Sequence, residues 1–398
     1  MASEWRTTTW GDEISLEYGR AIRGYSASVG KYRVFGSNGA IGWHSEYLAD
    51  GPGVILGRKG AYRGVRFSRD PFFVIDTAYY VRPKIAFDMR WLYYAIIYHR
   101  LGEIDDGSPI PSTTRAAVYV RQLEVPPLDE QVAIASILGL IDDKIDAVRE
   151  ESNSLERIVR ALFKSWFVDF DPVRAKAEGR EPEGMDAATA TIFPSELVDS
   201  QIGPIPAGWA TGSLADCVTF YNSTRVPLSS AERSMRQGPF PYYGAAGPID
   251  SVSDFLFDGE YVLVGEDGSV ISPDGKPVVQ HVWGKFWVNN HAHVLQPKNG
   301  WGVGGLLNLL RKVEIRPYVT GAVQPKLSMT NLKRVPVVIP AQELLSSFAT
   351  QTDRILSRVC LNTEYMKTLA EIRDTLLPRL ISGKLRVPEA EKLVEAAL

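Results

Sequence analysis

Histidines and cysteines are few in this chain of 398 residues, which has five of the former and two of the latter. His281, His291 and His293 lie within thirteen residues of one another, and imidazoles so grouped could ligate a metal ion. His291 and His293 also alternate along a predicted strand, where a histidine is more often held by hydrogen bonds. We therefore expect no metal site.

The other candidates for catalysis are weak as well. Asp70-Pro71-Phe72-Phe73 is similar to the loop with which adenine methyltransferases hold a flipped base. Its third residue is Phe rather than Pro, and no glycine-rich strand-to-helix fingerprint precedes it, so a turn that leads into a strand is the better interpretation. Cys217 and Cys360 lack a matched base and orienting acid. We expect no catalytic residue and no bound cofactor.

Two glycine-bounded loops differ in the sign of their charge. Gly57-Arg58-Lys59-Gly60 is basic, whereas Gly265-Glu266-Asp267-Gly268 is acidic. They could be two turns whose exposed residues drifted. They could also be one scaffold loop that reads different bases, since Arg and Lys reach guanine edges and acidic residues accept from cytosine N4. We favour the second interpretation.

Basic, polar and aromatic residues around these loops suit contacts with phosphates and bases. Around the first loop the candidate DNA-binding residues are Lys31, Tyr32, Arg33, Asn38, Arg58, Lys59, Tyr62, Arg63 and Arg66. Around the second loop they are Tyr242, Tyr243, Glu266, Asp267, Ser269, Lys276, Gln324 and Lys326.

The sequence that carries these loops is repeated. When the first half of the chain is aligned with the second half, one constant offset pairs Val74 with Val288 and Pro126 with Pro340. Further upstream, an offset shorter by six residues pairs Gly57 with Gly265. Six residues are therefore inserted in the second copy between Gly268 and Val288. Such a long period is not that of a solenoid, and it suggests a partner with two similar halves.

Each copy predicts a strand-rich domain followed by a long helix. Short β-branched and aromatic runs between turn residues predict the domains 1–125 and 208–338, each with one amphipathic helix, Met89–Arg100 and Val303–Lys312. The long spacer helices are expected at 126–168 and 339–382. A polar linker, 169–207, and a C-terminal tail, 383–398, complete the chain.

Apolar residues recur at heptad spacing in both long helices and predict a coiled coil. The first seam consists of Ile134, Leu138, Ile141, Ile145, Val148, Leu155, Val159, Leu162 and Trp166. The second consists of Phe348, Ile355, Val359, Met366, Leu369, Leu376 and Leu380. Pro378 should kink the second helix or end it early, and Gly383 is a natural stop. We expect the helices to pair antiparallel and to carry the two domains to opposite ends of a rod.

Composition is that of an ordinary globular protein, with 45% hydrophobic and 23% charged residues. A net charge of −3 argues against binding of nucleic acid by bulk positive charge alone. The N-terminus has no secretory pattern, no apolar run is long enough to span a bilayer, and the two cysteines do not suggest a disulfide framework. These features predict a cytoplasmic protein without membrane contact.

Three segments resemble the hallmark sequences of type I restriction-modification specificity subunits. They are Leu123–Gln131 (LEVPPLDEQ), Ala161–Pro172 (ALFKSWFVDFDP) and Leu376–Leu385 (LLPRLISGKL). The likeness extends over essentially the whole chain. Gln342-Glu343-Leu344 departs from the Glu-Glu-Gln-like start expected of the second helix.

The resemblance implies an α+β fold with two target recognition domains joined by an antiparallel coiled coil. It implies a non-catalytic subunit whose domains each bind one half of a bipartite, asymmetric site in double-stranded DNA. Two methyltransferase subunits, which bind S-adenosylmethionine, and restriction and translocase subunits would be its partners. The alternative from another class is a coiled-coil adaptor whose two domains bind proteins or peptides.

Overall fold

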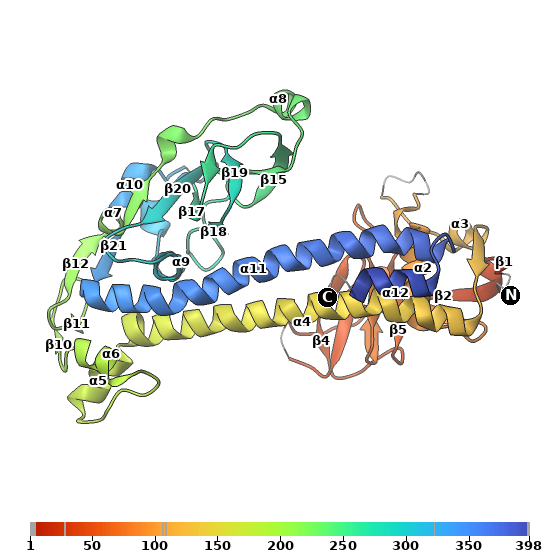
Figure 1. Cartoon of the computed structure of the whole chain (residues 1–398), viewed down its shortest axis with the longest axis horizontal. Helices are drawn as coiled ribbons and strands as arrows, with labels where there is room; N and C mark the ends of the chain where they lie inside the picture. The colour runs from red at the N-terminus through yellow and green to blue at the C-terminus, as the bar shows by residue number, and fades with distance from the viewer. Residues whose placement is uncertain (1–4, 28, 106, 108–109, 322, 396–398) are drawn as a thin grey trace. The chain divides into compact units, whose positions relative to one another are not determined.

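The computed structural model describes residues 5–27, 29–105, 107, 110–321 and 323–395. The chain forms two compact units, one of Met1–Val148 with Tyr365–Leu398 and the other of Arg149–Glu364. Each unit holds one strand-rich domain and a part of both long helices (Figure 1). Within the described part of the chain, none of the helices combines the length and the apolar character needed to cross a membrane.

The first domain contains two sheets and a separate two-stranded ladder. The ladder pairs β1 (Arg6–Thr9) with β9 (Gln122–Val125), so the first and last strands of the domain are neighbours. An antiparallel sheet has the order β2 (Ile14–Tyr18), β8 (Ala78–Pro83), β5 (Gly53–Gly57), β6 (Val65–Ser68). The other sheet has the order β4 (Gly39–His44), β3 (Tyr32–Gly36), β7 (Phe72–Val74), with β3 and β7 parallel.

Local sequence explains the helix that covers this domain. The Asp88 carboxylate caps α2 (Met89–Tyr98) by accepting from the backbone N–H groups of Arg90 and Trp91. The helix then buries Trp91, Leu92 and Ile96 in the main core of the unit. Short helices complete the domain: α1 (Trp10–Glu13), η1 (Leu101–Glu103) and α3 (Arg115–Tyr119).

The second domain repeats the strand order of the first and adds η3 (Asn222–Thr224), α8 (Ser230–Met235) and β16 (Phe257–Asp258). Its ladder pairs β12 (Ala210–Ser213) with β21 (Pro336–Ile339). One sheet has the order β13 (Val218–Phe220), β20 (Ala292–Pro297), β17 (Tyr261–Gly265), β18 (Val279–Val282). The other has the order β15 (Pro248–Val252), β14 (Phe240–Tyr243), β19 (Lys285–Val288), β16. The helices are α7 (Leu214–Cys217), η3, α8, α9 (Val303–Leu310), η4 (Arg316–Tyr318) and α10 (Met329–Lys333).

The six inserted residues lie in one loop. In the first copy four residues, 61–64, separate Gly60 from the start of β6 at Val65. In the second copy ten residues, 269–278, separate Gly268 from the start of β18 at Val279. The internal repeat is therefore a repeat of fold, and the insertion lengthens the segment that follows the acidic loop.

The long helices are α4 (Leu128–Lys164), which continues as a π turn, η2 (Ser165–Asp169), and α11 (Gln342–Ile381). In the first unit, the start of α4 shares a core with the end of α11. In the second unit, the end of α4 shares a core with the start of α11. The pair is therefore an antiparallel coiled coil.

Most of the predicted seam residues are buried: Ile134, Leu138, Ile141, Ile145, Val148, Val159, Trp166, Phe348, Val359, Leu369, Leu376 and Leu380. Leu155, Leu162, Ile355 and Met366 are half-buried. Phe163 and Leu356 are buried next to Leu162 and Ile355, a shift of one residue that reflects the mismatch between 3.5-residue and 3.6-residue periods. A polar pair stands within the seam of the second unit, where Asn362 Nδ2 donates to Ser152 Oγ at 3.2 Å.

Three segments between and after these elements differ from expectation. Pro378 does not end α11, because it stands in the last turn and removes only one helical hydrogen bond; Gly383 follows at φ 67°. The polar linker folds in part, as α5 (Asp171–Ala177), α6 (Ala187–Ile192) and the ladder β10 (Leu197–Val198) with β11 (Ile205–Pro206). The tail forms α12 (Val387–Glu395), which buries Ala390 and Val394.

Candidate nucleic-acid interface

The two glycine-bounded loops have the same backbone frame. In each copy, the second glycine of the loop and the residue that follows the first glycine bond to a proline-containing segment further along the chain. The bonds are Gly60 N to Pro111 O and Gly268 N to Pro325 O, both 3.0 Å, and Thr113 N to Arg58 O at 2.9 Å and Leu327 N to Glu266 O at 2.8 Å. Main-chain atoms alone make these bonds, so the side chains at the tips are free to differ.

In the first loop, Arg58 lies in an aromatic cage. Its guanidinium carbon is 5.2 Å from the ring centre of Tyr18 and 5.9 Å from that of Tyr79, and it donates to Asp76 O at 2.8 Å. Arg115 packs on Tyr18 from 4.2 Å. Burial raises the pKa of Tyr79 to about 12, so its ring stays neutral beside the cations. The cage fixes a half-buried cation next to the exposed Lys59.

Not all predicted basic residues in this domain are available to DNA. Arg63 donates to Gly60 O, Gly102 O and Ile104 O at 2.7 to 3.0 Å, which anchors the loop to the domain. Arg66 donates to Asn38 O at 3.0 Å and remains exposed, as does Asn38. Tyr62 is 78% exposed and is the aromatic side chain most open to solvent beside the loop.

The β3–β4 hairpin forms a second basic and aromatic surface. Lys31 lies over Tyr32 at 5.1 Å, and Tyr32 contacts Tyr47 at 5.0 Å between ring centres. Arg33 stacks on Trp43 at 4.6 Å. Sequence reasoning missed Trp43 and Tyr47, although the facing register of the hairpin, with Arg33 opposite Trp43, follows from a strand–turn–strand pattern.

In the second loop, Glu266 points into the protein. Its Oε2 is 2.7 Å from Arg225 Nη1 and 3.4 Å from His293 Nδ1, and both members of the Arg225–Glu266 pair are largely buried. Arg225 also donates to Ala292 O at 2.6 Å. Burial lowers the pKa of His293, which is held by Asn222 and Leu327 O at 2.8 and 2.7 Å. The Glu266 carboxylate therefore holds the loop in place rather than facing a base.

Asp267 pairs with His291, and the isolated bridge between Asp267 and Lys326 holds the loop against the segment that precedes α10. The exposed residues of this surface are Ser269, Gln324 and Lys326. Lys276 lies on the inserted segment, 3.8 Å from Glu314. These five polar side chains are the second-copy candidates that remain at the surface or pair there.

Tyr242 and Tyr243 differ from expectation in their exposure. Tyr242 is 1% exposed, and its hydroxyl accepts from Leu228 N at 2.9 Å, which makes it a core residue of β14. Tyr243 packs edge-on against Phe286 at 5.8 Å, and burial raises its pKa. Of these two successive residues of β14, Tyr242 is buried in the core, whereas Tyr243 is half-buried and packs against a neighbouring strand.

The three histidines do not form one cluster, and Asp70 and Pro71 lie just before a strand. His281, His291 and His293 each have a different partner, Glu260, Asp267 and Leu327, so they do not converge on one ion. Asp70 and Pro71 precede β7, where Phe72 and Phe73 are buried in the domain. The turn that was predicted is confirmed, and it holds core side chains.

We predict that Glu266→Gln destabilises the second unit by roughly 2–4 kcal/mol, because it leaves the Arg225 guanidinium largely buried without its counter-charge. Urea unfolding of the full chain measures this free energy. Lys59→Gln, at an exposed site, serves as the control and should change it by about 0.5 kcal/mol or less. A stable E266Q protein with altered sequence preference would instead identify Glu266 as a base-reading residue.

The chain matches the model of the family described as type I restriction modification DNA specificity domain twice, over residues 3–157 and 206–364. It is 25% identical over 357 residues to the type I restriction enzyme MjaIX specificity subunit of Methanocaldococcus jannaschii, covering 84% of this chain and 78% of that protein. It is 23% identical over 376 residues to the HindI specificity subunit of Haemophilus influenzae, covering 79% and 80%.

The fold is also similar to a solved structure. The crystal structure of a type I restriction-modification S subunit from M. genitalium superimposes with a TM-score of 0.56 at 18% identity, covering 95% of this chain and 96% of that one. The matched segments of the family model coincide with the two strand-rich domains and the starts of the helices that follow them. The chain therefore belongs to the type I restriction-modification specificity subunit family, and it carries two copies of the family's DNA specificity domain.

Proposed function

We propose that this chain is the non-catalytic, cytoplasmic subunit that selects the DNA target of a type I restriction-modification complex. Each specificity domain reads one half of a bipartite, asymmetric site in double-stranded DNA. The coiled coil sets the spacing between the halves and provides the docking surface for two methyltransferase subunits. Those subunits bring S-adenosylmethionine, and restriction and translocase subunits complete the nuclease.

One observation carries this proposal: the same main-chain frame presents different side chains in the two copies. The first frame offers the caged Arg58, the exposed Lys59 and the basic hairpin around Arg33. The second offers Asp267 and the exposed Gln324 and Lys326 beside it. Two loops with the same main-chain hydrogen bonds and different side chains suit a DNA target whose two halves have different sequences.

Local clusters account for DNA binding in a chain whose net charge is −3. Arg33 on Trp43 and Arg58 on Tyr18 present guanidinium planes backed by aromatic rings, an arrangement that suits phosphates and guanine edges. Steering and the remaining phosphate contacts would then come from the partner subunits.

The proposal is tested by expressing the chain with its cognate methyltransferase in a host that has no other modification system, followed by methylome sequencing. We expect one methylated motif of two defined halves separated by unspecified bases. Methylation without a consistent motif would contradict the proposal.

The adaptor alternative makes a different prediction in the same preparation. A peptide-binding adaptor would give an assembled complex with no sequence-selective, salt-dependent affinity for duplex DNA. A specificity subunit gives selective binding that weakens as salt is raised.

A further inference from the structure

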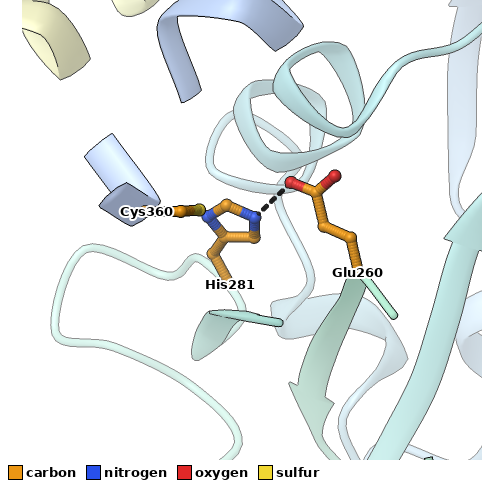
Figure 2. Close-up of side chains that lie close together, drawn as sticks. All are labelled: Glu260, His281 and Cys360. Atoms are coloured by element: carbon orange, nitrogen blue, oxygen red, sulfur yellow. Dashed lines mark hydrogen bonds and ion pairs between the residues drawn. The ribbon is translucent and has the colours of Figure 1, made fainter. Parts of the chain in front are cut away.

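Three potential metal ligands meet in the second unit at the point where the strand-rich domain lies against α11. They are Glu260, just before β17, His281 in β18, and Cys360 in α11. One ligand atom from each lies within 4.8 Å of the other two. His281 Nε2 is 2.7 Å from Glu260 Oε1, and the imidazole lies between the carboxylate and the thiol (Figure 2).

The donor set fits a particular class of ion. Imidazole nitrogen, thiolate sulfur and carboxylate oxygen together suit borderline-soft divalent cations such as Zn²⁺, and suit Mg²⁺ or Ca²⁺ poorly. The side chain of His281 is only 12% exposed, whereas that of Glu260 is 42% exposed and can adjust its position. Closing the three donors around an ion therefore requires a shift of the flexible carboxylate more than of the packed imidazole.

Further negative groups surround the three ligands. Asp353 lies two turns before Cys360 on α11, and its Oδ1 is buried without a hydrogen-bond partner among the described residues. Glu260 and His281 both act on Asp353 electrostatically, and Glu364 acts on Cys360. Carboxylates gathered around a partly buried thiol leave an excess of negative charge that a cation would offset.

The same surroundings argue against a nucleophilic cysteine. A Cys–His–acid series is also the arrangement of a thiol nucleophile, which requires a thiolate stabilised by positive charge. In the described part of the chain, the ionisable groups that meet the Cys360 thiol here are instead the Glu260 carboxylate and the His281 imidazole, with no Lys or Arg among them. The local charge favours a metal ligand over an unassisted nucleophile.

The cluster belongs to the second copy alone. At the positions of His281 and Cys360 the first copy has Phe67 and Asp146. There the domain is fastened to its helix differently, by Arg69 and Arg90, which both pair with Asp143 on α4.

The second copy has lost the residues for that attachment. Trp283, Gly304 and Ser357 stand where the first copy has Arg69, Arg90 and Asp143. The Glu260–His281–Cys360 cluster lies between the same two elements, domain and helix. It therefore lies where the second copy lacks the ion pairs of the first.

We propose that Glu260, His281 and Cys360 bind one Zn²⁺-class divalent cation, with a fourth coordination position open, and that the ion fastens the second specificity domain to α11. On binding, the Cys360 thiol would release its proton to solvent, one ring nitrogen of His281 would coordinate the ion, and the other ring nitrogen would carry the imidazole proton. The proposal is independent of the DNA-reading role.

The test uses the purified full-length chain titrated with Cd²⁺ or Co²⁺ alone. We expect thiolate-to-metal charge-transfer absorption that saturates at one equivalent. Cys360→Ser and His281→Gln should abolish it, and Glu260→Gln should weaken binding by at least about tenfold. The matched controls are Cys217→Ala, the other cysteine of this unit, and His291→Gln; both should keep the absorption.

A second readout separates loss of the site from loss of the fold. Zn²⁺ should raise the unfolding temperature of the native chain and leave that of Cys360→Ser unchanged, while circular dichroism confirms that the variant is folded. Absence of stoichiometric absorption in the native chain, or its persistence in C360S, would overturn the proposal. Rapid alkylation of Cys360 at neutral pH in the metal-free chain would also overturn it, in favour of a nucleophile.

Discussion

Replacement of residues 1–125 by the corresponding domain of a relative should change one half of the methylated motif and leave the other half and the spacer intact. The structure makes this boundary favourable. β1 and β9 pair over their whole length, from Arg6 with Val125 to Thr9 with Gln122, so both ends of the exchanged segment lie in one ladder and move together. The exchange leaves α4, α11 and the second domain unaltered.

The main risk in this exchange is the attachment of the domain to α4. Arg69 and Arg90 belong to the exchanged segment, whereas Asp143, which pairs with both, does not. A donor domain should therefore be chosen with basic residues at these two positions. Because the Asp143 pKa is held down, chiefly by its hydrogen bond from Arg90, this attachment is present at neutral pH and weakens as the pH falls through the lowered pKa.

Methylome sequencing of the chimaera reads the result, and the reciprocal exchange of residues 208–338 serves as the control because it should change the other half. An unaltered motif in either chimaera, or a change in both halves at once, would mean that the domains do not read DNA independently.

Insertion of three heptads into both long helices should be tolerated far better than insertion of one. The matched sites are between Val148 and Arg149 in α4 and between Glu364 and Tyr365 in α11, which are the boundaries of the two compact units. Insertions there preserve the contacts within each unit and the pairing of the seam. They change only the length of the coiled coil.

The reason is that DNA and the coiled coil rotate at different rates. One heptad lengthens the coiled coil by about 10 Å, which is the length of roughly three base pairs. Three base pairs rotate the second half-site about the DNA axis by about 100°, whereas one heptad rotates the seam by about 20° in the opposite sense. Three heptads add about 31 Å, or roughly nine base pairs. The second half-site is then rotated about the DNA axis by slightly less than one full turn. The angle that is missing from a full turn is close to the angle by which three heptads rotate the seam in the opposite sense. The two domains therefore meet their half-sites in almost the original orientation.

Methylation of a library of spacers measures this outcome. We expect the three-heptad variant to methylate sites with a spacer longer by about nine base pairs, and the one-heptad variant to lose most activity at every spacer. An insertion of three residues in each helix, which breaks the heptad pattern, is the control for disruption of the seam. An unchanged spacer in the active three-heptad variant would reject the role of the helices as a ruler.

The spacing of hydrophobic residues and the positions of glycines and prolines were enough to predict the architecture. The coiled coil follows from heptads such as Ile134, Leu138 and Ile141, its antiparallel direction from the long linker 169–207, and the duplicated domains from matched glycines and prolines. These signals are local or repeat at a fixed offset. They do not depend on knowing which distant residues come into contact.

The site could be predicted only in part, because exposure depends on distant partners. Glu266 looks like a loop-tip residue, yet Arg225 draws its carboxylate inward. Tyr242 looks like an aromatic contact beside a loop, yet its own side chain is buried in the domain. His281 and Cys360 lie far apart in the chain, and only the packing of β18 against α11 brings them together.

The main-chain frame of the two loops has a consequence for how the target can change over time. Gly60 and Gly268 hold their loops through main-chain hydrogen bonds, so a substitution of the exposed Lys59 leaves these bonds in place and changes only the side chain at the tip. Asp267, at the matching position of the second loop, is held by its own side chain through His291. Arg58 and Glu266 are likewise each tied to their surroundings by a side chain. New target sequences should therefore arise through single substitutions at the unanchored tip position, while the anchored positions change only together with their partners.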